Sequence, residues 1–177
     1  MSYTVGVDVG GTKVLGGVVD PDGTVLTTSR RDTPREGGSA LTQTIADVAL
    51  ELAAQYPVTA VGLSAAGFVS SDRKTMLATP NIAGWNGVQL DAELTALINL
   101  PVVLENDANA AAWGERTFGA GKGKQNMLMV TVGTGVGGGI IVNGELLRGA
   151  WRARLAEVGD IAPDERIPVR MPASAMA

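Results

Sequence analysis

Asp107 is the residue whose sequence neighbours best suit it to act as a base. Residues 101–104 predict a short buried strand, and residues 107–118, which contain no proline, predict a helix. Asp107 would then lie near the helix N-terminus, where free backbone amides and the helix dipole stabilise an ionised carboxylate. An ionised carboxylate can accept a hydroxyl proton. The same position also suits an ordinary N-cap, so this segment alone leaves both interpretations open.

Two glycine-rich turns between β-rich runs could bind phosphate, because glycine leaves backbone amides free to approach an anion. The first turn consists of Gly10, Gly11, Thr12 and Lys13, and the second spans residues 133–139 and begins with Gly133, Thr134 and Gly135. Asp8, just before the first turn, could orient a hydrated Mg²⁺, which needs few protein ligands. Either turn alone equally fits a plain hairpin. Together they predict two hairpins that clamp a polyphosphate, although neither has the spacing or context of a Walker A or dinucleotide motif.

The elements that would position these residues follow an α/β order. Strand patterns cover residues 3–9, 14–20 and 24–29 as an antiparallel meander, and an amphipathic helix over 39–56 precedes a strand at 58–63. A second helix is expected near 90–98. After a glycine- and lysine-rich segment at 119–124, residues 127–132 and 140–143 repeat the strand, turn and strand plan around the second glycine turn. This predicts two related domains, residues 1–119 and 120–177.

Composition restricts the chemistry. The 177 residues are 45% hydrophobic and 18% charged, which indicates a globular protein. A net charge of -4 and a pI near 4.8 give no general attraction to nucleic acid or membrane. Because the chain has no cysteine and no histidine, disulfides, thiol nucleophiles, histidine bases and Cys/His zinc sites are excluded. Without a signal-peptide pattern at its beginning, the protein is expected in the cytoplasm. Trp85 and Trp113 are interpreted as core side chains.

Four segments together resemble one known family, the ROK family of sugar kinases and repressors in the actin-like ATPase superfamily. In chain order they are GVDVGGTK at 6–13, PN at 80–81, ENDAN at 105–109 and TVGTGVGGG at 131–139. The resemblance implies an actin-like ATPase (ribonuclease H-like) domain with a mixed sheet and flanking helices, followed by an incomplete second domain. It also implies ATP-dependent phosphorylation of a hexose, with the family's glucokinases nearest and glucose 6-phosphate as product.

By the same resemblance, Asp107 is the general base, and three residues meet the hexose: Gly67, Asn81 and Asn106. Asp8 and the turn at 10–13 match the first ATP phosphate motif, and residues 133–135 match the second. Glu157 matches a sugar-binding glutamate, but Asp160 stands where the family has a histidine, and no cysteine follows to form the family's zinc loop.

Family members continue well past residue 177, so the chain is interpreted as truncated or frame-shifted, with a poorly ordered tail over 150–177. Exposed strands in a partial domain predict a homo-oligomer or self-association. Two alternatives stay open: a catalytically inactive sugar-binding fragment, and a sugar-responsive repressor without its DNA-binding domain. The repressor is disfavoured because family repressors carry a helix-turn-helix ahead of the phosphate motif, whereas here Tyr3 already begins a strand pattern.

Overall fold

Three hairpin-connected strands form one side of a five-stranded mixed sheet in the computed structural model, which describes residues 2–80, 82–132 and 136–148. The sheet has the order β3-β2-β1-β4-β7. Its strands are β1 (Tyr3–Val9), β2 (Lys13–Val19), β3 (Val25–Asp32), β4 (Val58–Ala65) and β7 (Val102–Asn106). β1 pairs antiparallel with β2 and parallel with β4, and β4 pairs parallel with β7. The predicted meander and the mixed sheet are confirmed.

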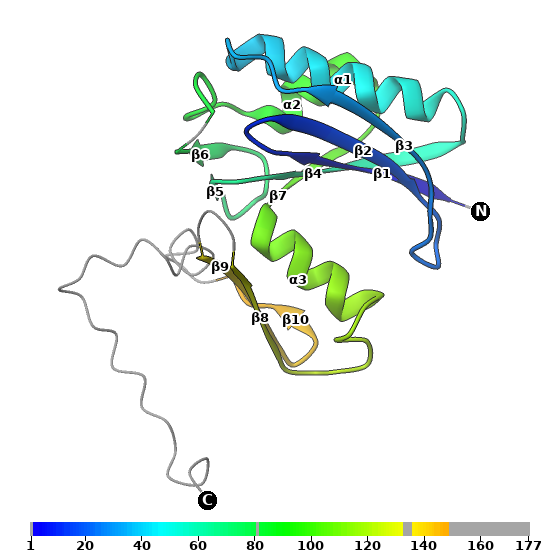
Figure 1. Cartoon of the computed structure of the whole chain (residues 1–177), viewed down its shortest axis with the longest axis vertical. Coiled ribbons are helices and arrows are strands. Elements are labelled where there is room, and N and C mark those ends of the chain that lie inside the picture. The colour runs from blue at the N-terminus through cyan, green and yellow to red at the C-terminus, as the bar shows by residue number, and fades with distance from the viewer. Residues whose placement is uncertain (1, 81, 133–135, 149–177) are drawn as a thin grey trace, which may run out of the picture.

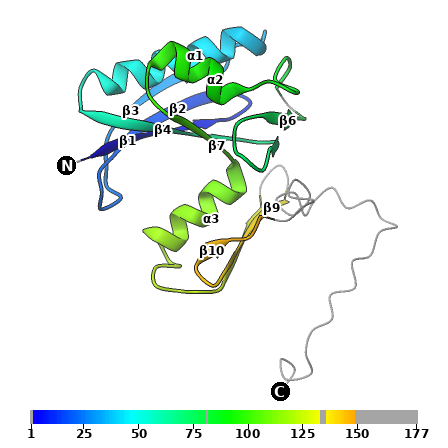
Figure 2. The same ribbon diagram turned by 180° about the vertical axis from the view of Figure 1, so that it is seen from behind.

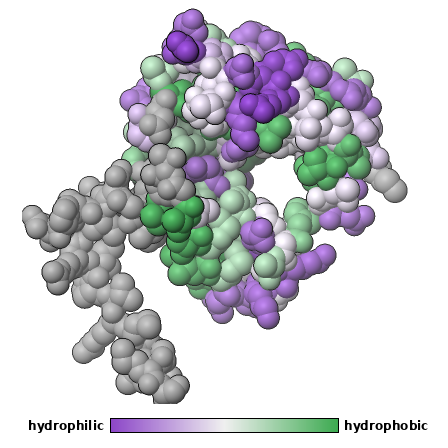
Figure 3. Space-filling model, in the orientation of Figure 1, coloured by the Kyte–Doolittle hydropathy of each residue, from purple (hydrophilic) through white to green (hydrophobic). Residues whose placement is uncertain are grey.

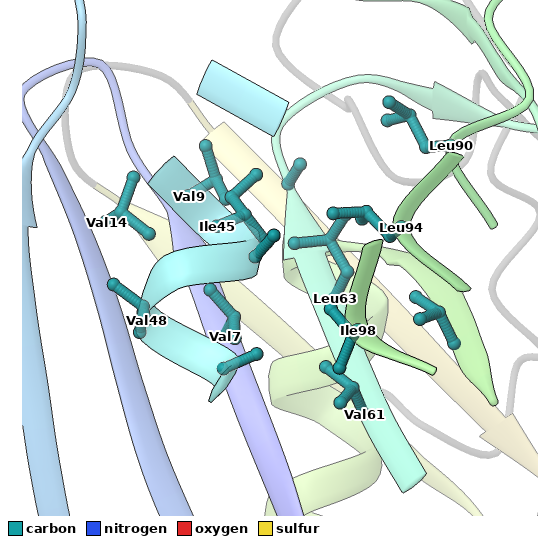
Figure 4. Packing of buried hydrophobic residues seen from close by; sticks show 14 of the residues in the cluster. Val7, Val9, Val14, Ile45, Val48, Val61, Leu63, Leu90, Leu94 and Ile98 are labelled. Atoms are coloured by element: carbon teal, nitrogen blue, oxygen red, sulfur yellow. The ribbon is translucent and has the colours of Figure 1, made fainter. Parts of the chain in front are cut away.

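Two helices cover one face of this sheet, α1 (Gly38–Ala53) and α2 (Leu90–Ile98), as Figures 1 and 2 show from opposite sides. Ile45 and Val48 of α1 meet Val7, Val9 and Val14 of β1 and β2, and Leu94 of α2 lies over Leu63 of β4 (Figure 4). All of these side chains are buried. Strand alternation therefore sends one set of residues into the core and the other set to the opposite face.

The opposite face of the sheet borders a cavity of about 750 Å³. Gly6 and Gly62 lie there side by side as partners in β1 and β4, and a Cβ at either would meet no atom within 4 Å. α3 (Asp107–Thr117) contributes Ala110 and Trp113 to the cavity wall. Figure 3 shows the molecule hollowed between the sheet and α3.

A second, three-stranded sheet follows, with the order β10-β9-β8. Its strands are β8 (Met127–Val132), β9 (Val136–Val142) and β10 (Glu145–Leu146), and α3 packs against it through a small cluster of Ala112, Ile141 and Leu146. The two strands predicted on either side of the second glycine turn are present as β8 and β9. The opposite side of this sheet exposes apolar side chains, visible as green in Figure 3. They include Leu128, Val130 and Val132 of β8.

The predicted extent of the second glycine turn is wrong, because β9 already begins at Val136. The last three glycines of that run lie inside the strand. A Cβ at Gly139 would stand 2.4 Å from Cβ of Ala112 and 3.0 Å from the carbonyl oxygen of Ala108. Glycine at 139 thus lets α3 approach the second sheet closely, which a local sequence pattern does not reveal.

A short hairpin, β5 (Phe68–Val69) with β6 (Met76–Ala78), was not predicted and follows directly on Gly67.

Trp85 is buried as expected, and its indole Nε1 donates to the Thr42 hydroxyl at 3.3 Å. The same expectation for Trp113 is wrong, since 44% of this residue is exposed at the cavity. In the described part of the chain, no helix combines the length and apolar character needed to cross a membrane.

Candidate active site

Asp107 is the first residue of α3 and follows β7 without an intervening loop. The N-cap, however, is Asn106, whose side-chain oxygen accepts a hydrogen bond from the backbone amide of Asn109 at 3.1 Å. The interpretation of Asp107 as the cap is therefore wrong. Its own carboxylate is exposed and accepts only from the amide of Ala108 among the described residues, at 2.9 Å. Because the neighbouring residue serves as the cap, this carboxylate is free to meet a ligand.

Asn106 joins the start of α3 to the loop at Gly67. Its side-chain amide donates to the carbonyl oxygen of Gly67 at 3.0 Å, and only 4% of the residue is exposed. Gly67 has a φ of 145°, and a Cβ there would lie 2.6 Å from the carbonyl oxygen of Ala78. The side-chain amide of Asn106 retains one further N–H donor and one further acceptor position on its oxygen. Two of the predicted sugar-contacting residues are thus in direct contact beside Asp107.

The first glycine turn is tight and braced from β3. The amide of Gly10 donates to the carbonyl oxygen of Lys13 at 2.9 Å. Thr33, just after β3, donates its hydroxyl to the carbonyl oxygen of Gly10 at 2.8 Å and its amide to that of Thr12 at 3.2 Å. Gly11, Thr12 and Lys13 are exposed. The turn therefore has a fixed backbone and an open outer surface, as an anion-binding loop requires.

Asp8 precedes this turn near the end of β1 and is fixed by Ser64 of β4. The Ser64 hydroxyl donates to one carboxylate oxygen of Asp8 at 3.0 Å, which leaves the second oxygen for other partners. A hydrated Mg²⁺ suits this arrangement, because the ion keeps several of its waters and needs only one or two carboxylates beside phosphate oxygens. Asp8, Ser64 and Glu105 are partners in register across β1, β4 and β7.

The sheet brings the predicted residues of the first unit to one edge. β1, β4 and β7 are parallel, so the turn after β1, the loop after β4 and Asp107 after β7 all lie at their carboxyl ends. This edge is where α/β proteins commonly bind ligands. Neither Asp107 nor the glycine turn lines the 750 Å³ cavity, which lies along the sheet face. Five predicted site residues lie outside the described residues: Asn81, Gly133, Thr134, Gly135 and Glu157.

Four further residues of this region escaped the sequence analysis. Ser64 and Thr33 hold Asp8 and the first glycine turn in place, and Glu105 forms an ion pair with Arg148 at 2.6 Å. Glu105 could have been found from the sequence, because it is an acidic residue at the start of the ENDAN segment. The other three carry no local signal, because their partners are distant in sequence.

Comparison with known proteins places the chain among sugar kinases and repressors. The model of the ROK family matches residues 4–169, which extends past Gly149. A glucokinase of Streptomyces coelicolor is 45% identical over 91% of this chain and 50% of its own length. A ROK family glucokinase of Streptomyces griseus, solved with glucose and AMPPNP, has a TM-score of 0.84 at 43% identity and is covered to 52%.

A xylose repressor of Bacillus subtilis is 32% identical over 83% of this chain and 39% of its own length. The chain thus spans about half the length, or less, of these relatives.

Proposed function

Because this chain belongs to the ROK family, we propose that it transfers the terminal phosphoryl group of ATP to a hexose, converting glucose to glucose 6-phosphate. The observation that carries the proposal is the position of Asp107. Its free carboxylate stands beside the linked pair of Asn106 and Gly67, at the sheet edge that also bears the phosphate turn. The two glucokinases named above support glucose as the acceptor.

In the proposed reaction, the hexose hydroxyl oxygen attacks the terminal phosphorus while its proton passes to the Asp107 carboxylate, and ADP leaves. The loose transition state of phosphoryl transfer needs alignment more than a strong base. Asp107 is the first residue of α3, and its exposed carboxylate lies next to Asn106, which is proposed to contact the hexose. The hexose is proposed to be held by four residues: Asn106, Asn81, Gly67 and Glu157.

The phosphates of ATP are proposed to lie on the backbone of the turn at 10–13, with Gly133, Thr134 and Gly135 as the second phosphate-binding segment. Asp8 would hold Mg²⁺ through its free carboxylate oxygen or through a bound water. The ion would supply positive charge that neutralises the developing phosphate charge. Ser64 fixes the carboxylate of Asp8 in place for this role.

Two measurements on the 177-residue chain test the proposal: a coupled assay of hexose-dependent ADP formation, and calorimetry with glucose. Turnover with glucose, lost in Asp107→Asn and kept in Asp91→Asn, is the expected result. Asp91 is a suitable control because it also lies in the first turn of a helix, α2. Absence of turnover under saturating ATP and Mg²⁺ would overturn the kinase proposal.

A second candidate function is sugar binding without catalysis, since the chain spans about half the length of its kinase relatives. Heat of glucose binding without ADP formation is the outcome that this candidate predicts. The similarity to the xylose repressor supports a third candidate, sugar-responsive repression. For that candidate, calorimetry with a panel of sugars should show binding of a sugar that is not phosphorylated in the kinase assay.

A further inference from the structure

An ion pair connects the second sheet to the strand that carries the proposed base. Glu105 is in β7, two residues before Asp107, and Arg148 follows β10. The guanidinium Nη2 and Nε of Arg148 donate to Oε2 of Glu105 at 2.6 and 3.2 Å. The two side chains are only 30% and 16% exposed, so the pair is better shielded from solvent than an ordinary surface ion pair.

The other carboxylate oxygen of Glu105 holds the first turn of α3. Its Oε1 accepts from the backbone amide of Asn106 at 3.2 Å and from the side-chain amide of Asn109 at 3.3 Å. The backbone amide of Asn109 donates in turn to the side chain of Asn106. Asp107 is therefore enclosed by a closed set of hydrogen bonds among Glu105, Asn106 and Asn109, while its own carboxylate stays outside that set.

The ion pair also makes a difference between two carboxylates on one face of the sheet, those of Asp8 and Glu105. Asp8, Ser64 and Glu105 occupy one row across three neighbouring strands, so Asp8 and Glu105 are about 10 Å apart at two strand spacings. Arg148 neutralises Glu105, and both line the cavity together with Asp8 and Ser64. Of the two carboxylates, Asp8 is the one that stays available to a cation.

We propose that Glu105 and Arg148 are positioning residues for Asp107: Glu105 holds the first turn of α3, and Arg148 ties that turn to the second sheet. The role rests on the proposed kinase function, since it concerns the orientation of its base. With Arg148 in place, Oε2 of Glu105 is bound by the guanidinium. Oε1 then keeps its hydrogen bonds with the backbone amide of Asn106 and the side-chain amide of Asn109. Without it, the carboxylate is free to turn away and Asp107 loses its alignment.

The first test is amide hydrogen exchange of the 177-residue chain, which needs no catalytic activity. In Arg148→Met and Glu105→Gln, exchange at Asn106 and Asn109 is expected to accelerate about tenfold, the effect of losing one charged hydrogen bond. Arg148→Lys keeps the charge and is expected to restore part of the protection. The matched control is Arg31→Met, which breaks the exposed Arg31–Glu51 ion pair on the other side of the sheet.

Unchanged exchange at Asn106 and Asn109 in Arg148→Met would overturn the proposal. So would equal acceleration throughout α3, because that pattern reports general loss of stability. If Arg148→Met does not fold, Arg148→Lys and Glu105→Gln still decide the matter, with intermediate and full acceleration expected respectively.

The second test is kinetic. A misaligned base lowers kcat by about tenfold or more and leaves KM for the hexose within about threefold, whereas a merely structural pair would leave kcat intact in the folded protein. In the Asp107→Asn background, Arg148→Met is expected to cost no further activity. Inactivity of the wild-type chain would refute the kinase function alone, and the exchange result would still show whether the pair holds the helix start.

Discussion

The side-chain amide of Asn106 donates to the carbonyl oxygen of Gly67 across 3.0 Å, while its oxygen caps α3. One asparagine thereby joins the loop after β4 to the helix that begins with Asp107. This arrangement relieves Asp107 of capping. Asp107, the proposed base, and the loop at Gly67, which is proposed to contact the hexose, consequently have fixed positions relative to one another.

Replacing Asp107 with asparagine is expected to lower turnover by about 10²- to 10⁴-fold, the usual contribution of a general base. The fold should be unaffected, because no other element of the described chain depends on the Asp107 side chain. A coupled ADP assay and a thermal unfolding curve measure the two effects. Near-normal turnover in Asp107→Asn would remove Asp107 from its role, and Asp91→Asn serves as the control.

Replacing Asn106 with alanine is expected to destabilise the protein by about 2 kcal/mol, the sum of a lost N-cap and a lost hydrogen bond. Asn106→Asp keeps the acceptor for the Asn109 amide and should cost less in unfolding free energy. Urea titration gives the values. Gln89→Ala is the control, because Gln89 occupies the N-cap of α2 without a side-chain capping bond. Equal losses at Asn106 and Gln89 would contradict this account of the cap.

Replacing Ser64 with alanine should weaken Mg²⁺ binding without unfolding the protein, because Asp8 then loses its only described side-chain donor. The loss of about one hydrogen bond corresponds to roughly a fivefold weaker interaction. Calorimetric titration of Mg²⁺ with AMPPNP measures it directly. Ser29→Ala is the matched control, since the Ser29 hydroxyl bonds to Glu51 away from this site. An unchanged Mg²⁺ isotherm for Ser64→Ala would exclude this role of the serine.

Two strand glycines should respond differently to alanine. Gly139→Ala is expected to cost about 1–3 kcal/mol of unfolding free energy by overpacking against α3. Gly62→Ala should change stability by less than about 0.5 kcal/mol, because a Cβ there meets no atom within 4 Å. Chemical denaturation of both variants tests the pair. If Gly139→Ala proves as stable as Gly62→Ala, the close approach of α3 to β9 is not what requires glycine.

The exposed face of the second sheet is expected to cause self-association. Val130→Lys places a charge in the middle of the apolar row Leu128, Val130 and Val132, and should shift the sedimentation profile toward monomer. Leu77→Lys changes an equally exposed apolar residue of another strand, β6, and should leave the profile unaltered. Identical profiles for the wild type and Val130→Lys would place any association elsewhere.

The sequence by itself determined the longer strands, the helices and the location of Asp107 at a strand–helix junction, because side-chain periods of about 2 and 3.6 residues are local properties. The short strands β5, β6 and β10 were not predicted. Its motifs also pointed to the family, which the comparisons confirm over residues 4–169.

The tertiary structure alone decided how the site is held. Ser64 and Asp8 are 56 residues apart, Arg148 and Glu105 are 43 apart, and Asn106 and Gly67 are 39 apart. Such contacts depend on sheet register and on the packing of α3, which no local pattern encodes. The glycines after Val136 show the same limit: their spacing suggested a turn, whereas the approach of a helix explains Gly139.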